Sequence, residues 1–135
     1  MKTRIFILLL TLFCGVNLAA QPVIGLTKDE VQSLIKHSFK EFKLDKSITQ
    51  QAFNYLKYVN DSETKTWIIF FSDDDICTHT KTVCDYSEYD FVLDNLKKSC
   101  KKVSDGSWEY REDSKIYLIT MEESDWYFTL RETLK

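Results

Sequence analysis

The sequence predicts an α+β fold. An internal duplication of a helix plus a three-stranded antiparallel meander would give a roughly six-stranded antiparallel sheet with two helices on one face. The first observation is the run of five apolar residues Trp67–Phe71, which ends at Ser72 and three aspartates. This run is too short to span a bilayer and is typical of a strand covered on both faces. The second observation is the order of the predicted elements, and the third is a similarity between the two halves of the chain.

Residues 1–20 have the layout of a cleavable signal peptide. Lys2 and Arg4 precede the apolar segment Ile5–Phe13, and small residues follow it. We therefore expect export to the periplasm or the extracellular space, with residues 21–135 as one α+β domain. The apolar segment is also too short for a transmembrane helix.

The charge balance argues against nucleic-acid binding. The chain has 18 Lys+Arg and 21 Asp+Glu, a formal net charge of −3, and loss of the signal peptide removes two positive charges. Sequence-independent binding of nucleic acid requires a basic face, which this composition does not provide. Aromatic residues make up 14% of the chain, a heavy load for its length.

The first half of the domain begins with a helix. Thr27 can cap its first amides and Glu30 can reach back to the cap. An apolar stripe at helical spacing follows, formed by Val31, Leu34, Ile35, Phe39 and Phe42. Three strands are then predicted at Ala52–Val59, Lys65–Ser72 and Ile76–Val83.

The second half repeats this order. Asp85 and Glu88 have the same capping spacing. The predicted apolar stripe consists of Tyr89, Leu93, Leu96, Cys100 and Val103. Three strands are predicted at Ser107–Glu112, Lys115–Glu122 and Asp125–Glu132.

The two halves, at about residues 25–84 and 85–135, also match in sequence. A repeat of this kind predicts repeated architecture. With a shift of fifty residues, Lys65, Trp67, Ile68, Ile69 and Asp75 fall on Lys115, Tyr117, Leu118, Ile119 and Asp125.

The pattern Gly25-x-Thr27-x-x-x-Val31 resembles the start of small secreted helix-plus-sheet modules such as β-lactamase inhibitory proteins and outer-membrane assembly lipoproteins. The resemblance covers seven residues and implies the same kind of fold. It carries no function across.

Three cysteines follow the signal peptide, an odd number for an oxidising compartment. Cys84 and Cys100 bracket the second predicted helix and would lie roughly 24 Å apart at ~1.5 Å per residue, which excludes a bond between them. A helix folding back along the third strand would bring Cys100 beside Cys77. We therefore expect a Cys77–Cys100 disulfide with Cys84 as a free thiol, and a local Cys77–Cys84 bridge is the alternative.

No motif in the sequence predicts catalysis or a cofactor. A nucleophilic Cys84 at a helix start, assisted by His79, is conceivable, but a separation of five residues along a strand points the two side chains to opposite faces. Asp73–Asp75 lack the spacing of a calcium loop and are ordinary turn residues. His37 and His79 are the only histidines and lack zinc-ligand spacing. We expect no catalytic residue, no metal site and no cofactor.

The remaining signal is aromatic. Two helices cover one sheet face, and alternation places a second set of residues on the other face, where Ile68 and Leu118 would point to the helices. This predicted interaction face consists of Trp67, Ile69, Phe71, Tyr117, Ile119 and Tyr127. Sheet curl, the N-terminal segment or a second copy could also cover it.

The sequence therefore predicts a small exported, non-enzymatic protein that binds a protein or a small ligand through this aromatic face. One alternative is an enzyme that uses Cys84 or the acidic cluster. Another is a self-associating subunit, such as a homodimer joined through the same face.

Overall fold

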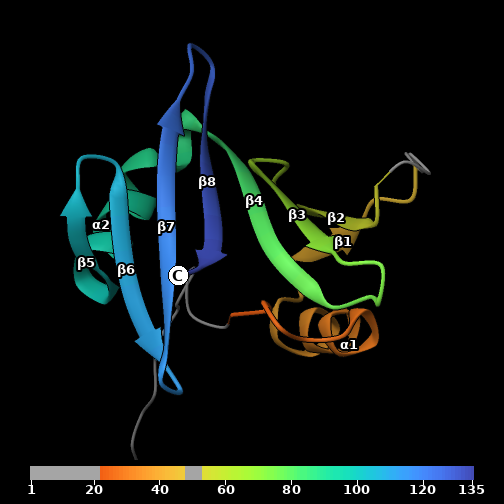
Figure 1. The fold of residues 1–135 in the computed structure, drawn as a ribbon. Coiled ribbons are helices and arrows are strands. Elements are labelled where there is room, and N and C mark those ends of the chain that lie inside the picture. Colours follow the sequence, from red (N-terminus) through yellow and green to blue (C-terminus); the bar gives the residue numbers. More distant parts are fainter. Residues whose placement is uncertain (1–21, 48–52) are drawn as a thin grey trace, which may run out of the picture.

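A computed structural model describes residues 22–47 and 53–135, which form an eight-stranded antiparallel sheet with two α-helices on one face (Figure 1). This confirms the predicted α+β class, the antiparallel sheet and the pair of helices, but the sheet has eight strands and not six. The elements are α1 (Lys28–Ser38), β1 (Phe42–Leu44), β2 (Tyr55–Asn60), β3 (Lys65–Phe71), β4 (Cys77–Asp85), a 3-10 helix (Tyr86–Glu88), α2 (Tyr89–Ser99), β5 (Lys101–Ser104), β6 (Ser107–Glu112), β7 (Lys115–Glu123) and β8 (Tyr127–Leu134).

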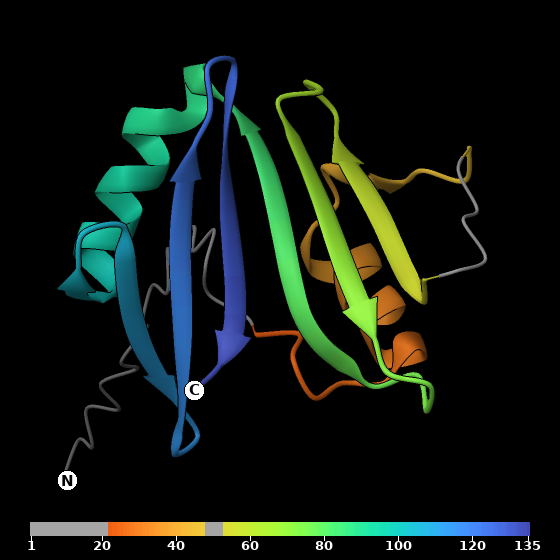
Figure 2. The same cartoon turned by 45° about the horizontal axis from the view of Figure 1, so that its top comes forward.

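The strands follow the order β1-β2-β3-β4-β8-β7-β6-β5 across the sheet. Each half of the chain thus contributes a helix and four strands that pair in sequence order, and the halves meet where β4 pairs with β8. Figure 2 shows both helices behind the sheet, α1 behind the first half and α2 behind the second. The opposite face of the sheet carries no described element.

The start of α1 has the predicted capping box. The Thr27 side chain accepts a hydrogen bond from the Glu30 amide, and the Thr27 amide donates to the Glu30 carboxylate at 2.8 Å. Val31 and Ile35 then lie fully buried against the sheet. The helix ends at Ser38, so Phe39 caps its C-terminus and Phe42 belongs to β1.

The start of α2 differs from the prediction. The Asp85 carboxylate accepts from the Ser87 amide at 2.8 Å and opens the 3-10 turn that leads into α2. Glu88 does not reach back to the cap, because its carboxylate binds Lys65 instead. Val92 and Leu96 form the buried stripe of the helix.

The two outer strands of the sheet, β1 and β5, are not predicted by the sequence pattern. Both follow a helix within a few residues, and their apolar residues Phe42 and Val103 fit the helical spacing of the segment before them. β1 has only three residues, and all four residues of β5 are exposed, so neither shows the alternation that marks a strand.

The apolar core is divided between the two helices. One cluster lies under α1 and includes Val31, Ile35 and Ile69, while the other lies under α2 and includes Leu96, Ile119 and Phe128. Within residues 22–47 and 53–135, neither helix has the length and apolar character needed to cross a membrane. The predicted signal peptide, residues 1–20, lies outside the described residues.

Candidate functional site

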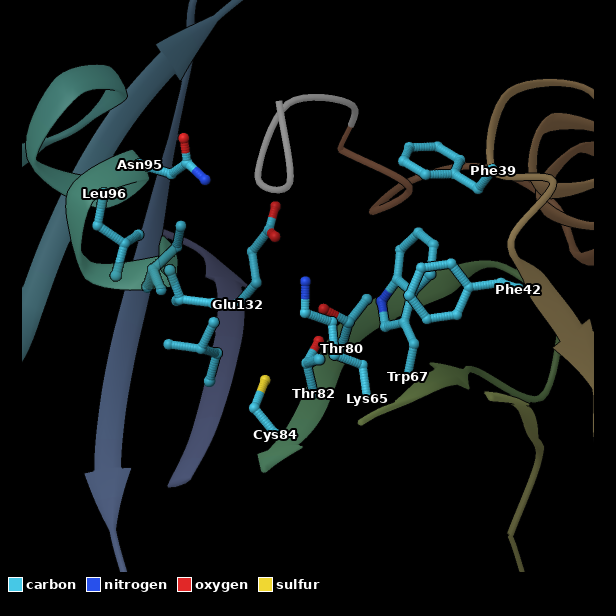
Figure 3. Close-up of a pocket in the computed structure, with 13 residues that line it drawn as sticks. Phe39, Phe42, Lys65, Trp67, Thr80, Thr82, Cys84, Asn95, Leu96 and Glu132 are labelled. Atoms are coloured by element: carbon cyan, nitrogen blue, oxygen red, sulfur yellow. The ribbon is translucent and has the colours of Figure 1, made fainter. Parts of the chain in front are cut away.

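A pocket lies on the helix side of the sheet, between the α1 core and the α2 core. It opens above β4 and β8, the strands through which the two halves of the chain meet, and has a cavity volume of about 80 Å³. Figure 3 shows its lining residues converging from both halves. The pocket combines apolar walls with a small set of polar groups, which is the usual composition of a ligand site.

The wall on the α1 side is aromatic. Phe39 follows α1, Phe42 lies in β1, and both rings pack edge-on against Trp67 of β3, with centroid distances of 5.4 and 5.6 Å. Edge-to-face contacts of this kind hold rings in fixed orientations. The wall therefore presents a rigid apolar surface to the cavity.

The wall on the α2 side is aliphatic. Val92 and Leu96 come from α2, Ile119 from β7 and Leu130 from β8. The cavity is thus bounded by apolar side chains on both sides, which makes any polar group inside it poorly solvated.

Glu132 is the acidic group of the pocket. It lies on β8 directly opposite Thr80 of β4, and its Oε1 accepts a hydrogen bond from the Tyr110 hydroxyl. Burial is the main effect that raises the pKa of the Glu132 carboxyl to about 7. The hydrogen bond from Tyr110 lowers this pKa, and the nearby charge of Glu112 raises it further. The carboxyl therefore exchanges its proton near neutral pH.

Asn95 reaches the pocket from α2, and Figure 3 shows its amide directed toward the cavity. Its Nδ2 atom is buried and has no hydrogen-bond partner among the described residues. An unsatisfied buried donor costs about 1–3 kcal/mol, so native proteins seldom retain one without a reason. The free N–H groups are suited to an acceptor atom of a ligand.

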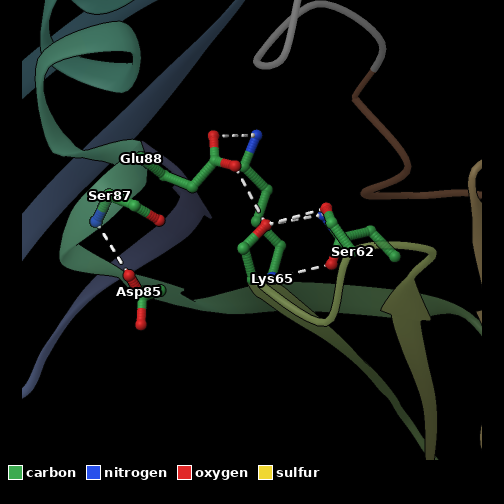
Figure 4. A network of polar contacts seen from close by, with 7 residues as sticks. Ser62, Lys65, Asp85, Ser87 and Glu88 are labelled. Atoms are coloured by element: carbon green, nitrogen blue, oxygen red, sulfur yellow. Dashed lines mark hydrogen bonds and ion pairs between the residues drawn. The ribbon is translucent and has the colours of Figure 1, made fainter.

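Lys65 is the basic group of the pocket and is held at one end of it. Its Nζ lies 3.3 Å from Oε2 of Glu88, and the Thr64 hydroxyl donates to Oε1 of the same carboxylate at 2.9 Å (Figure 4). Lys65 is 8% exposed, so this ion pair lies in a largely dry environment. Glu88 thus neutralises Lys65, and no ion pair joins Lys65 to Glu132 in the described part of the chain.

Cys84 lines the same pocket but is a poor nucleophile. Burial is the main effect that raises the pKa of its thiol to about 11. The charge of Lys65 lowers this pKa, and the charge of Glu88 raises it. His79 lies on the other face of the sheet, where its ring stacks on Phe70 with a centroid distance of 4.5 Å. His79 is therefore not positioned to accept the proton of the Cys84 thiol, as formation of the reactive thiolate would require.

The structure corrects the side of the sheet assigned to the predicted interaction face. Its residues Ile69, Phe71, Tyr117 and Ile119 are at most 8% exposed and belong to the cores under the helices. Trp67 and Ile119 line the pocket, and only Tyr127 is exposed, at 45%. Apart from Tyr127, the set shares one face as expected, but the helices cover this face. The sequence does not distinguish the two faces, because β3 is apolar on both and alternation alone does not show which face the helices cover.

The predicted Cys77–Cys100 disulfide is wrong for this structure, in which Cys77, Cys84 and Cys100 are all free. Cys77 lies in the core under α1, whereas Cys84 and Cys100 contact the core under α2. The prediction required α2 to fold back along β4. Instead α2 lies over the second half of the sheet, which carries Cys100 away from Cys77 (Figure 2).

The acidic segment Asp73–Asp75 forms the turn between β3 and β4. Asp75 has a φ of 59°, accepts a hydrogen bond from Asn54 at 2.6 Å and lies 3.7 Å from Nζ of Lys28. In the described ranges, no group of three or more His, Cys, Asp or Glu side chains is arranged to hold a metal ion. The turn therefore has a structural explanation.

The sequence pattern does not predict three polar residues of the pocket, Glu132, Asn95 and Lys65. One signal for Glu132 was available, since it continues the inward series of Phe128 and Leu130 on β8 and so places a carboxylate on an apolar face.

Comparison with protein families, with curated proteins and with solved structures finds no match to this chain.

Proposed function

We propose that this chain is an exported, non-enzymatic binding protein that holds a small, mainly apolar ligand in the pocket between α1 and α2. The single observation that carries the proposal is the buried Nδ2 of Asn95, which has no partner among the described residues and is directed into an apolar cavity. A ligand with an acceptor oxygen removes the cost of that unsatisfied donor.

The lining of the pocket defines the chemical class of the ligand. Asn95 donates to a carbonyl or hydroxyl oxygen, and the Glu132 carboxyl, with its pKa of about 7, can donate when protonated and accept when ionised. The ring wall around Trp67 favours a flat or aliphatic group. The cavity of about 80 Å³ is about half the size of the roughly 150 Å³ cavity that takes up benzene in another protein, so a short chain or small ring fills it.

This proposal retains the predicted binding by an aromatic sheet face and relocates the site. The ligand occupies the part of that face that the two helices leave open. We also infer that the two halves derive from an internal duplication, because each consists of a helix and four strands, and that their junction created the pocket.

Binding, not catalysis, is favoured by the state of the reactive groups. Cys84 is held as a thiol by burial, and Lys65 is engaged by Glu88. An enzyme using Glu132 as a general base would need a second reacting group, and the described lining places none beside it.

The proposal is tested by mass spectrometry and fluorescence. Native mass spectrometry of the protein purified from its own cells should show a bound small molecule. Cyclopentanol, a small neutral ring with one acceptor oxygen, should bind with a change in tryptophan emission, because Trp67 lines the pocket. Thr82→Phe, which fills the pocket, should weaken binding at least about tenfold, whereas Thr66→Phe on the neighbouring strand, on the uncovered face, should not.

Two outcomes would contradict the proposal. One is equal binding of cyclopentanol by the Thr82→Phe and Thr66→Phe variants, since the probe would then lie outside the pocket. The other is a protein that carries no ligand and binds no probe although it is folded by circular dichroism.

A further inference from the structure

The face of the sheet opposite the helices has a basic centre. Lys81 lies between the pocket residues Thr80 and Thr82 on β4, so alternation points it to the uncovered face. Arg131 lies between Leu130 and Glu132 on β8 and points the same way. Figure 2 shows β4 and β8 side by side in the middle of this face.

Lys81 and Arg131 are directly opposite each other across the β4–β8 pairing, and both are exposed. No ion pair joins either of them to an acid in the described part of the chain. Like charges directly opposite on neighbouring strands destabilise a sheet. The protein thus keeps two unneutralised cations at the centre of an uncovered face, although its net charge is −3.

The other charged groups of this face do not neutralise the pair. Lys57 of β2 is a further cation of this face, and the acid that it meets is Asp45, at 3.2 Å. Glu109 of β6 pairs with the Lys135 side chain. Glu122 of β7 lies opposite Thr129, away from the level of the two cations, and makes no ion pair with them. A carboxylate brought by another molecule therefore meets an unoccupied cationic site.

Apolar side chains of β3 lie beside Lys81. His79 lies two residues from Lys81 and stacks on Phe70, with the ring planes 8° apart. Burial, followed by the charge of Arg131, lowers the pKa of His79, so the stacked ring is neutral at neutral pH. Ile68 lies directly opposite Lys81 and is half-buried. Arg beside aromatic surface is typical of the centre of a protein interface.

We propose that this surface, defined by Lys81, Arg131, Phe70, His79 and Ile68, binds an acidic segment of a partner protein. Two carboxylates meet Lys81 and Arg131, and a neighbouring apolar side chain covers the Phe70–His79 stack. A nucleic acid requires a longer stripe of cations than this pair. A free inorganic anion has no apolar group that could cover the Phe70 and Ile68 side chains.

This proposal does not depend on the pocket, because the two sites lie on opposite faces of the sheet. A protein partner can engage Lys81 and Arg131 whether or not a ligand occupies the cavity beside Glu132. The failure of one proposal therefore leaves the other intact.

The test uses a fluorescein-labelled peptide in which glutamates flank one phenylalanine, and a matched peptide with glutamine in place of glutamate. Fluorescence anisotropy with the full chain should show binding of the glutamate peptide that weakens as salt is raised. The Lys81→Gln, Arg131→Gln double variant should bind at least about tenfold more weakly. The matched control is Lys97→Gln, Lys98→Gln on α2, which removes two exposed cations from the helix side and should bind like the parent.

Amide chemical-shift mapping of the parent protein supplies a readout that needs no variant. The shifts caused by the glutamate peptide should gather on β3, β4 and β8 and spare α1 and α2. The double variant should remain folded, because it relieves the repulsion between Lys81 and Arg131.

Several outcomes overturn the proposal. The glutamine peptide could bind as well as the glutamate peptide, or the α2 control could lose as much affinity as the double variant. Tighter binding of a DNA oligonucleotide would identify a nucleic-acid surface. Self-association that disappears in the double variant, measured by sedimentation velocity, would identify a second copy as the occupant. The absence of any binding at millimolar peptide would show that the face has no acidic partner.

Discussion

The two halves of the molecule place different side chains at corresponding positions of the sheet. In the first half, Ile69 of β3 is paired with Thr80 of β4, and in the second half, Ile119 of β7 is paired with Glu132 of β8. Both isoleucines are buried under their own helix. Thr80 and Glu132 lie opposite each other where the halves meet. The apolar framework is thus repeated, while the polar position at the junction differs and supplies the carboxyl group of the pocket.

The helix starts show the same division. Glu30 closes the capping box of α1 with Thr27, which serves only the helix. Glu88, at the corresponding place before α2, binds Lys65 and Thr64 at the rim of the pocket. The two glutamates therefore differ in role, since Glu30 stabilises its own helix whereas Glu88 holds a lysine of the pocket.

The largest expected effect tests which face of the sheet is core. Ile69→Asp should abolish folding or cost more than about 4 kcal/mol, because it buries an unpaired charge. Ile68→Asp, on the uncovered face, should cost much less. Urea denaturation followed by circular dichroism compares the two variants, and the pair Ile119→Asp and Leu118→Asp repeats the test in the second half. Equal losses for Ile68 and Ile69 would contradict the assigned faces.

A second prediction compares the two lysines that pair with acids near the ends of the helices. Lys65→Met should lower the free energy of unfolding by about 2 kcal/mol, because Glu88 loses its partner in a largely buried position. Lys28→Met, which removes the more exposed pair with Asp75, should cost less than about 1 kcal/mol. Thermal and urea unfolding measure both. A larger loss for Lys28→Met would contradict the assignment of Lys65–Glu88 as the more stabilising ion pair.

A third prediction concerns pH. The pKa of Glu132 is raised in the folded state to about 7, so the folded protein binds a proton more tightly than the unfolded chain. Stability should therefore fall as pH rises from about 4.5 to 7, by about 1–2 kcal/mol after allowance for partial exposure. Glu132→Gln should lack this fall, whereas Thr80→Val at the corresponding position should retain it. Parallel pH slopes for the parent and Glu132→Gln would rule out the titration of Glu132 as the cause.

The smallest effect compares the caps. Thr27→Ala should cost about 1 kcal/mol, because it opens the capping box of α1. Asp85→Ala removes hydrogen bonding to Ser87 alone, at an exposed 3-10 turn, and should cost less. Amide hydrogen exchange in the first turn of each helix checks the assignment, and a greater loss of protection in α2 would contradict it.

Much of the fold was predictable because local signals specify it. The Thr27 cap, the Asp73–Asp75 turn and the apolar run before that turn each require only neighbouring residues. The ends of the helices were not predictable, because Phe42 fits a helical stripe and a short strand equally well. Its true partner is Trp67, far along the chain, and that contact decides the structure.

The candidate site depends on tertiary placement. Lys65, Asn95 and Glu132 belong to three different elements, and each has an ordinary role when the sequence is considered locally. Only the pairing of β4 with β8 brings them to one cavity. The assignment of the faces failed for a related reason, since Ile68 and Ile69 are equally apolar and only helix packing distinguishes them.

The last strand of the chain lies in the middle of the sheet. β4 is complete long before β8 is synthesised, and residues 86–126 separate the two strands, so the edge of β4 has no partner until the C-terminus is available. Pairing across so long a stretch is slow. We therefore expect the first half to remain association-prone during synthesis, and a chain truncated before Tyr127 to leave the edges of β4 and β7 open to other strands.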